Sequence, residues 1–103
     1  MPRVFSYGSL QKHEVQLATF GELLPGVAAE IVGFEVVHLH RGGKQLANVV
    51  LSRSPQSRVR GTVFEFTAAQ LAVADGYERA DNYARIEAPL TAGGQAWVYV
   101  DAS

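Results

Sequence analysis

The sequence contains no cysteine, which excludes disulfide bonds and any thiolate nucleophile. No apolar run approaches the ~20 residues that a helix needs to cross a bilayer. The first residues carry one arginine and no apolar stretch of the kind found in a secretory signal. We therefore expect a cytoplasmic protein that is not held in a membrane.

Charge of either sign is also scarce, with a formal net charge of -1. The basic residues are scattered, whereas a nucleic-acid-binding surface needs them clustered. The chain has 103 residues, and hydrophobic residues make up 48% of them. That is enough for one core, so we expect a single domain over residues 1–103 with no nucleic-acid partner, as a monomer or a weak homodimer.

Short apolar segments separated by turn residues predict a chain rich in strands. Strands are expected at residues 4–6, 27–39 (one or two strands, bent at Gly33), 45–51, 59–66, 86–90 and 95–100. Tight turns are expected at residues 41–44 and 92–94, where glycines gather. This pattern predicts an α+β fold built on a mixed, mostly antiparallel, barrel-like sheet with one or two short helices.

The clearest helix begins after Thr67, which forms a capping box with Gln70. Gly76 stands where a glycine often ends a helix, so we expect the helix to stop there. Residues 11–20 have a looser apolar spacing, which fits either a short helix or a long turn.

The stretch Val4 to Leu10, with sequence VFSYGSL, reads as the end of a buried strand followed by a turn. Gly8 would permit a backbone angle that other residues avoid. A strand that ends in this way leaves backbone N–H groups without partners, and such a donor cluster suits a carboxylate or an oxyanion. The same three residues, Tyr7, Gly8 and Ser9, also occur in ordinary turns.

Several motifs, taken together, resemble the gamma-glutamylcyclotransferase family, including its gamma-glutamylamine branch. They are Phe5-Ser6-Tyr7-Gly8-Ser9-Leu10, Val59-Arg60-Gly61, Ala74-Asp75-Gly76-Tyr77-Glu78 and Tyr83-Ala84-Arg85. Their order and spacing match over nearly the whole chain. One departure is Ala74, where the family usually has leucine, and this changes core volume without touching the chemistry.

The resemblance implies that Glu78 is the catalytic carboxylate. A carboxylate against aromatic surface loses hydration, which raises its pKa toward neutrality and suits a general acid/base. From the residues alone, a solvated glutamate in a charged loop fits as well. The resemblance further implies that backbone amides of Tyr7, Gly8, Ser9 and Leu10 hold the glutamyl head of a small γ-glutamyl substrate.

The reaction that the resemblance implies is intramolecular. The amine of a γ-glutamyl amine or γ-glutamyl amino acid attacks its own side-chain carbonyl, 5-oxoproline forms, and the amine leaves. No cofactor and no metal is needed. The alternative is a non-catalytic domain that binds a small ligand on the same scaffold.

The remaining polar residues allow more than one interpretation. Tyr83 and Arg85 share one strand face, so Tyr83 could bind substrate while Arg85 pairs with Asp75 or Glu78. His38 and His40 also share a face, but two histidines fall short of the three or four ligands of a zinc site. We therefore expect no metal there.

Overall fold

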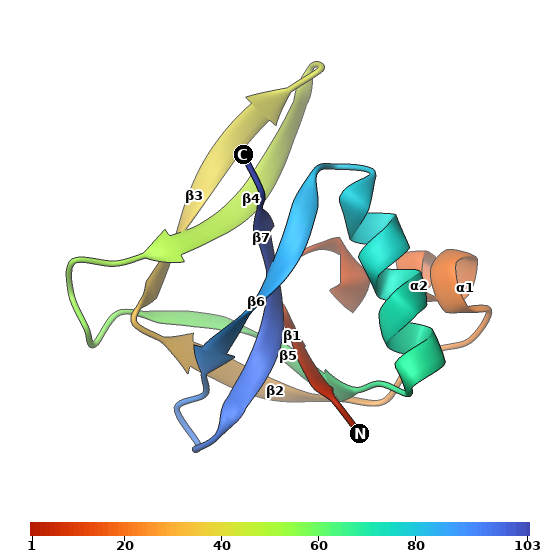
Figure 1. Ribbon diagram of the computed structural model, residues 1–103, viewed down its shortest axis with the longest axis horizontal. Helices are drawn as coiled ribbons and strands as arrows, with labels where there is room; N and C mark the ends of the chain where they lie inside the picture. Colours follow the sequence, from red (N-terminus) through yellow and green to blue (C-terminus); the bar gives the residue numbers. More distant parts are fainter.

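The strand β1 (Arg3–Ser6) lies at the centre of the larger sheet in a computed structural model that describes residues 1–103 (Figure 1). It pairs antiparallel with β5 (Arg58–Glu65) and parallel with β7 (Gln95–Asp101). The outer strands are β2 (Gly26–Val32), beside β5, and β6 (Tyr83–Pro89), beside β7. The expected strand at the N-terminus is thus confirmed, with partners on both of its edges.

A second sheet consists only of β3 (Phe34–Arg41) and β4 (Lys44–Leu51), which project away from the larger sheet as a hairpin (Figure 1). Gly33, with φ of 87°, lies between β2 and β3 where the chain changes sheets. The turn of the hairpin places Gly42 and Gly43 at φ of 53° and 78°, angles that a glycine adopts without strain. The one or two strands expected at residues 27–39 are therefore two strands in different sheets.

The α+β class and the mostly antiparallel pairing are confirmed, but the sheet is not a closed barrel. Its edge strands meet only at one bridge, between Ile31 and Leu90. Two helices, α1 (His13–Phe20) and α2 (Ala68–Arg79), lie side by side at one flank of the sheet (Figure 1). A 3-10 turn, η1 (Ser9–Gln11), precedes α1, so the segment at residues 11–20 is a helix and not a long turn.

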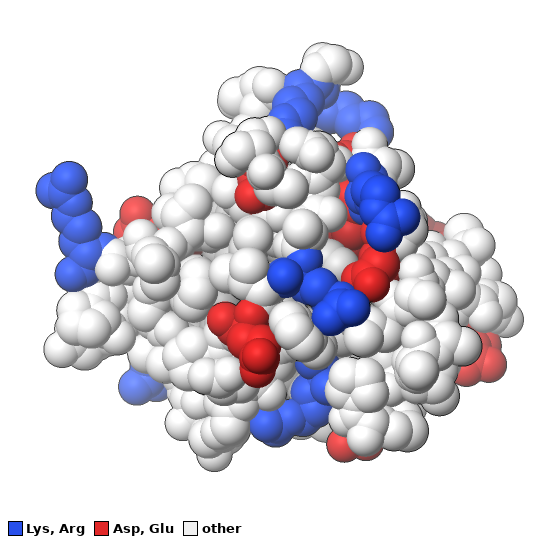
Figure 2. All heavy atoms as spheres, viewed as in Figure 1, with Lys and Arg blue, Asp and Glu red and all other residues white.

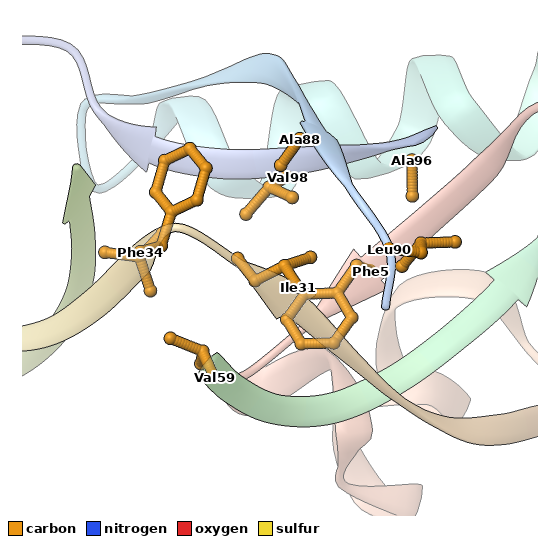
Figure 3. Packing of buried hydrophobic residues seen from close by; sticks show 9 residues of the cluster. Phe5, Ile31, Phe34, Val59, Ala88, Leu90, Ala96 and Val98 are labelled. Atoms are coloured by element: carbon orange, nitrogen blue, oxygen red, sulfur yellow. The ribbon is translucent and has the colours of Figure 1, made fainter. Parts of the chain in front are cut away.

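The core has two parts because successive strand residues face opposite sides of the sheet. Phe5 belongs to a cluster inside the curve of the sheet that also includes Ile31, Phe34 and Val98 (Figure 3). Val4 belongs to a second cluster between the sheet and the helices. Both Val4 and Phe5 are fully buried, so β1 contributes to both clusters, as its neighbours β5 and β7 also do.

Helix α2 begins as expected but ends later than expected. Thr67 accepts a hydrogen bond from the Gln70 amide, and the Gln70 side chain accepts one from the Thr67 amide. The helix then continues through Gly76 to Arg79, so the prediction that Gly76 ends it is wrong. A mid-helix glycine costs about 1 kcal/mol relative to alanine. The packing of Tyr77 against the core offsets that cost, and the left-handed residue comes later, at Asn82 with φ of 63°.

Charged side chains of both signs are dispersed over the face seen in Figure 2, with uncharged surface between them. None of the helices is long and apolar enough to cross a membrane.

Candidate active site

A cavity of about 490 Å³ opens where the end of β1, the end of α2 and the strand β4 come together. This volume lies within the range of ~300–1,000 Å³ that is usual for small-molecule sites. Its wall includes Tyr7, Gly8, Ser9, Glu78 and Tyr83. The structure therefore brings five of the six residues singled out in the sequence to one cavity, from segments far apart in the chain.

Leu10 is the sixth residue and does not line the cavity. Its side chain is buried in the cluster between sheet and helices. Behind it, the buried Gln16 donates to the Leu10 carbonyl at 2.9 Å and accepts from the Leu24 amide at 3.0 Å. The buried side chain of Leu10 thus anchors the loop to the core.

The loop from Tyr7 to Leu10 is held by side chains on both sides. Gln11 donates to the Gly8 carbonyl at 3.3 Å and accepts from the Thr62 hydroxyl at 2.9 Å. The Gly8 amide donates to the Ser6 hydroxyl at 3.3 Å, whereas the Ser9 amide donates to no turn or side-chain acceptor. Gly8 has φ of -129° and ψ of -142°, so it does not adopt the positive φ that favours glycine.

Glu78 projects into the cavity from the last turn of α2. Burial, together with the nearby negative charge of Asp81, raises the pKa of its carboxyl from 4.5 to about 7. No hydrogen bond or cation opposes this rise in pKa. A carboxyl with a pKa near 7 can both accept and return a proton at neutral pH.

Asp75 lies three positions before Glu78 on α2 and is occupied by structural contacts. Its carboxylate accepts two hydrogen bonds from Arg85, at 2.8 and 3.2 Å, and a third from the Tyr99 hydroxyl at 2.7 Å. The Arg85 guanidinium holds the pKa of Asp75 below its usual range and lies 4.5 Å from the centre of the Trp97 ring. Of the two partners left open for Arg85, the structure thus shows Asp75.

All four tyrosines of the chain lie at or beside the cavity. The Tyr7 hydroxyl donates to the Tyr99 carbonyl at 2.6 Å, and the Tyr83 hydroxyl donates to the Ala47 carbonyl. The hydroxyls of Tyr77 and Ser9 share a hydrogen bond at 2.8 Å. Burial raises the pKa of Tyr7, Tyr83 and Tyr99, so these phenols stay protonated donors at neutral pH.

Sequence reasoning missed several residues of the wall. Lys12 and Asp81 bring charges of opposite sign, and Gln45, Leu46 and Ala47 come from β4. The β4 residues carry no motif, because only the folding of the hairpin brings them near the loop. His38 and His40 are exposed on β3 and do not line the cavity, and no cluster of three metal-ligating side chains occurs in the chain.

Residues 4–103 match the family model described as gamma-glutamyl cyclotransferase, AIG2-like. The chain belongs to this family. No curated protein matched the sequence. The cyclotransferase motifs quoted above thus fall within a match that spans almost the whole chain.

Solved structures share the cyclotransferase-like fold at low identity. A solution structure of At3g28950.1 from Arabidopsis thaliana has a TM-score of 0.77 and 23% identity, and the match covers 96% of this chain and 61% of that one. An uncharacterized protein from Homo sapiens has a TM-score of 0.78 and 20% identity, covering 98% and 66%. A structure named gamma-glutamyl cyclotransferase has a TM-score of 0.72 and 17% identity, covering 99% and 67%. The chain therefore spans less than two thirds of the Arabidopsis protein.

Proposed function

We propose that the protein is a cyclotransferase that converts a γ-glutamyl amine or γ-glutamyl amino acid to 5-oxoproline and a free amine. The observation that carries the proposal is the half-buried carboxyl of Glu78, with a pKa of about 7, on the wall of the cavity that also includes the loop at Tyr7, Gly8 and Ser9. Family membership supports the same reaction class.

In this reaction Glu78 first accepts a proton from the α-ammonium group of the substrate. The free amine attacks the γ-carbonyl carbon and forms the C–N bond of a five-membered ring. Glu78 then returns the proton to the departing nitrogen as the original amide C–N bond breaks. The ring nitrogen loses a second proton, which passes to the released amine, so the products are the neutral lactam and an ammonium ion and atoms and charges balance. Both reacting groups belong to one molecule, so holding the substrate in a folded conformation contributes much of the rate enhancement.

The two ends of a γ-glutamyl head differ in charge, and so do parts of the cavity wall. The ammonium group is attracted by Glu78 and Asp81, whereas the α-carboxylate is attracted by Lys12 and the loop amides. This sorting favours one orientation, with the α-amine beside Glu78. The leaving amine then extends toward Gln45, Leu46 and Ala47 of β4.

The test is incubation of the purified chain with a panel of γ-glutamyl dipeptides and γ-glutamyl amines, followed by detection of 5-oxoproline. We expect product from at least one class of leaving group, and at least ~10²-fold slower product formation by the Glu78→Gln variant at the same enzyme concentration. Binding of a panel member without product would instead favour the non-catalytic ligand-binding domain.

A further inference from the structure

Tyr99 joins the two walls of the cavity through different atoms. Its hydroxyl donates to Asp75 of α2 at 2.7 Å, and its backbone carbonyl accepts from the Tyr7 hydroxyl at 2.6 Å. The residue is 5% exposed and belongs to the cluster between sheet and helices. One residue of β7 therefore contacts both the helix that carries Glu78 and the loop that faces it.

The contact with α2 is close to Glu78 along the helix. Residues three apart on a helix lie on the same face, so Asp75 and Glu78 are neighbours. Arg85 also binds Asp75, and the Trp97 ring beneath its guanidinium restricts its movement. Asp75 is thus held from β6 by Arg85 and from β7 by Tyr99, which leaves the last turn of α2 little freedom to pivot.

We propose that Tyr99 is a positioning residue: through its hydrogen bond to Asp75 it sets the place of Glu78 relative to the loop at Tyr7, Gly8 and Ser9. This inference deepens the proposed function and rests on it for its kinetic test. A carboxyl that must serve as base and then as acid has to meet two nitrogens in turn, so small displacements of it are costly.

The decisive variant is Tyr99→Phe, which keeps the buried ring and the carbonyl that binds Tyr7 and removes only the bond to Asp75. We expect kcat to fall about tenfold with KM changed less than about twofold, because the base moves while the binding loop stays in place. The melting temperature should fall by only a few degrees, since Arg85 still pairs with Asp75.

A matched control is Val98→Ala, at the neighbouring position of β7 on the opposite face of the sheet. Val98 is fully buried, so its truncation lowers stability without touching the Tyr99 contacts. We expect Val98→Ala to melt at a lower temperature than Tyr99→Phe and to keep the kcat of the unaltered protein. An equal loss of kcat in both variants would overturn the proposal.

A double variant tests whether the effect passes through Asp75. If it does, Tyr99→Phe combined with Asp75→Asn loses no more kcat than the worse single variant. Losses that multiply would show that Tyr99 acts by another route and would overturn the proposal. If Asp75→Asn does not fold, the pKa of Glu78 in Tyr99→Phe decides the question.

That pKa can be followed by NMR of carboxyl-labelled glutamate in the full chain, which requires no substrate. The groups that face Glu78 are Asp81, Tyr7, Tyr83 and Tyr99. Once α2 can pivot, water reaches Glu78 and its pKa should fall from about 7 toward 4.5. An unchanged pKa would count against Tyr99 as a positioning residue.

The 5-oxoproline assay and the NMR titration test the proposed function and the role of Tyr99 separately. Failure of the unaltered protein to form 5-oxoproline from any panel member would reject the proposed function. The NMR titration would still test whether Tyr99 determines the surroundings of Glu78.

Discussion

The hydroxyl groups of Ser9 and Tyr77 lie 2.8 Å apart, although 68 positions separate the two residues in the chain. Ser9 belongs to the loop after β1, and Tyr77 immediately precedes Glu78 on α2. This hydrogen bond therefore ties the proposed substrate-binding loop directly to the helix that carries the proposed base.

Replacing Glu78 by glutamine keeps the shape of the side chain and removes its basicity. We expect kcat on the preferred γ-glutamyl substrate to fall by ~10²–10⁴, the usual contribution of a general base. Glu87→Gln is the matched control, because Glu87 is exposed on β6 and lies outside the cavity. Steady-state assays of 5-oxoproline release check this prediction, and a Glu78→Gln variant within a few-fold of the unaltered enzyme would remove Glu78 from the mechanism.

The rate should depend on pH through the same carboxyl. Only ionised Glu78 can accept the substrate proton, and its pKa is about 7. We therefore expect kcat/KM to rise with pH from 5 and to level off above ~7.5. A profile that is already flat from pH 5 upward would mean that the group with the raised pKa is not the base.

Stability should respond to pH in the opposite sense. The carboxyl of Glu78 has a pKa of about 7 when folded and about 4.5 when exposed, so the folded state binds more protons between these values. The contribution of this group to stability is therefore complete below pH 4.5 and is lost as the pH rises through about 7.

The side chain of a glutamine at position 78 does not ionise, so it makes no pH-dependent contribution to stability. Above pH 7, Glu78→Gln should melt at a higher temperature than the unaltered protein, and the difference should shrink toward pH 5. Thermal melts across this range check the prediction. A difference that is independent of pH would argue against a raised pKa for Glu78.

Lys12 is the cation that shares the cavity wall with the loop. If it attracts the α-carboxylate of the substrate, Lys12→Met should raise KM about two- to fivefold, the worth of an exposed ion pair. The effect should weaken at high salt, since salt screens exposed charges. Arg53→Met is the control, as Arg53 is exposed and away from the cavity, and an equal change in both variants would show a general charge effect instead.

The N-terminal strand should be essential for folding. Deleting residues 1–6 removes the partner of both β5 and β7 together with the buried Val4 and Phe5. We expect this truncation to abolish cooperative thermal unfolding as monitored by circular dichroism. Removing only the exposed Ala102 and Ser103 should lower the melting temperature by a few degrees at most. A truncated chain that melts near the full-length temperature would contradict the central role of β1.

Local signals predicted most of the elements correctly. The capping box at Thr67 satisfies amides of the same helix turn, and the glycines at positions 42 and 43 accept the angles of a hairpin turn wherever it lies. Such features depend on neighbours in the chain, so the sequence displays them. The predicted end of α2 was wrong because it depends on a contact with distant residues. Gly76 permits the helix to stop, but the packing of Tyr77 against the core extends it.

The sequence by itself determined the alternation that buries Val4 and Phe5 on opposite faces of β1, the turn that follows, and the presence of a glutamate in a motif with Asp75 and Tyr77. Only the tertiary structure decided that β4 forms one side of the cavity, that Arg85 pairs with Asp75, and that Tyr99 touches both walls. It also decided the chemistry of Glu78, because a pKa near 7 arises from desolvation, and desolvation depends on what packs around the carboxyl once the distant strands have come together.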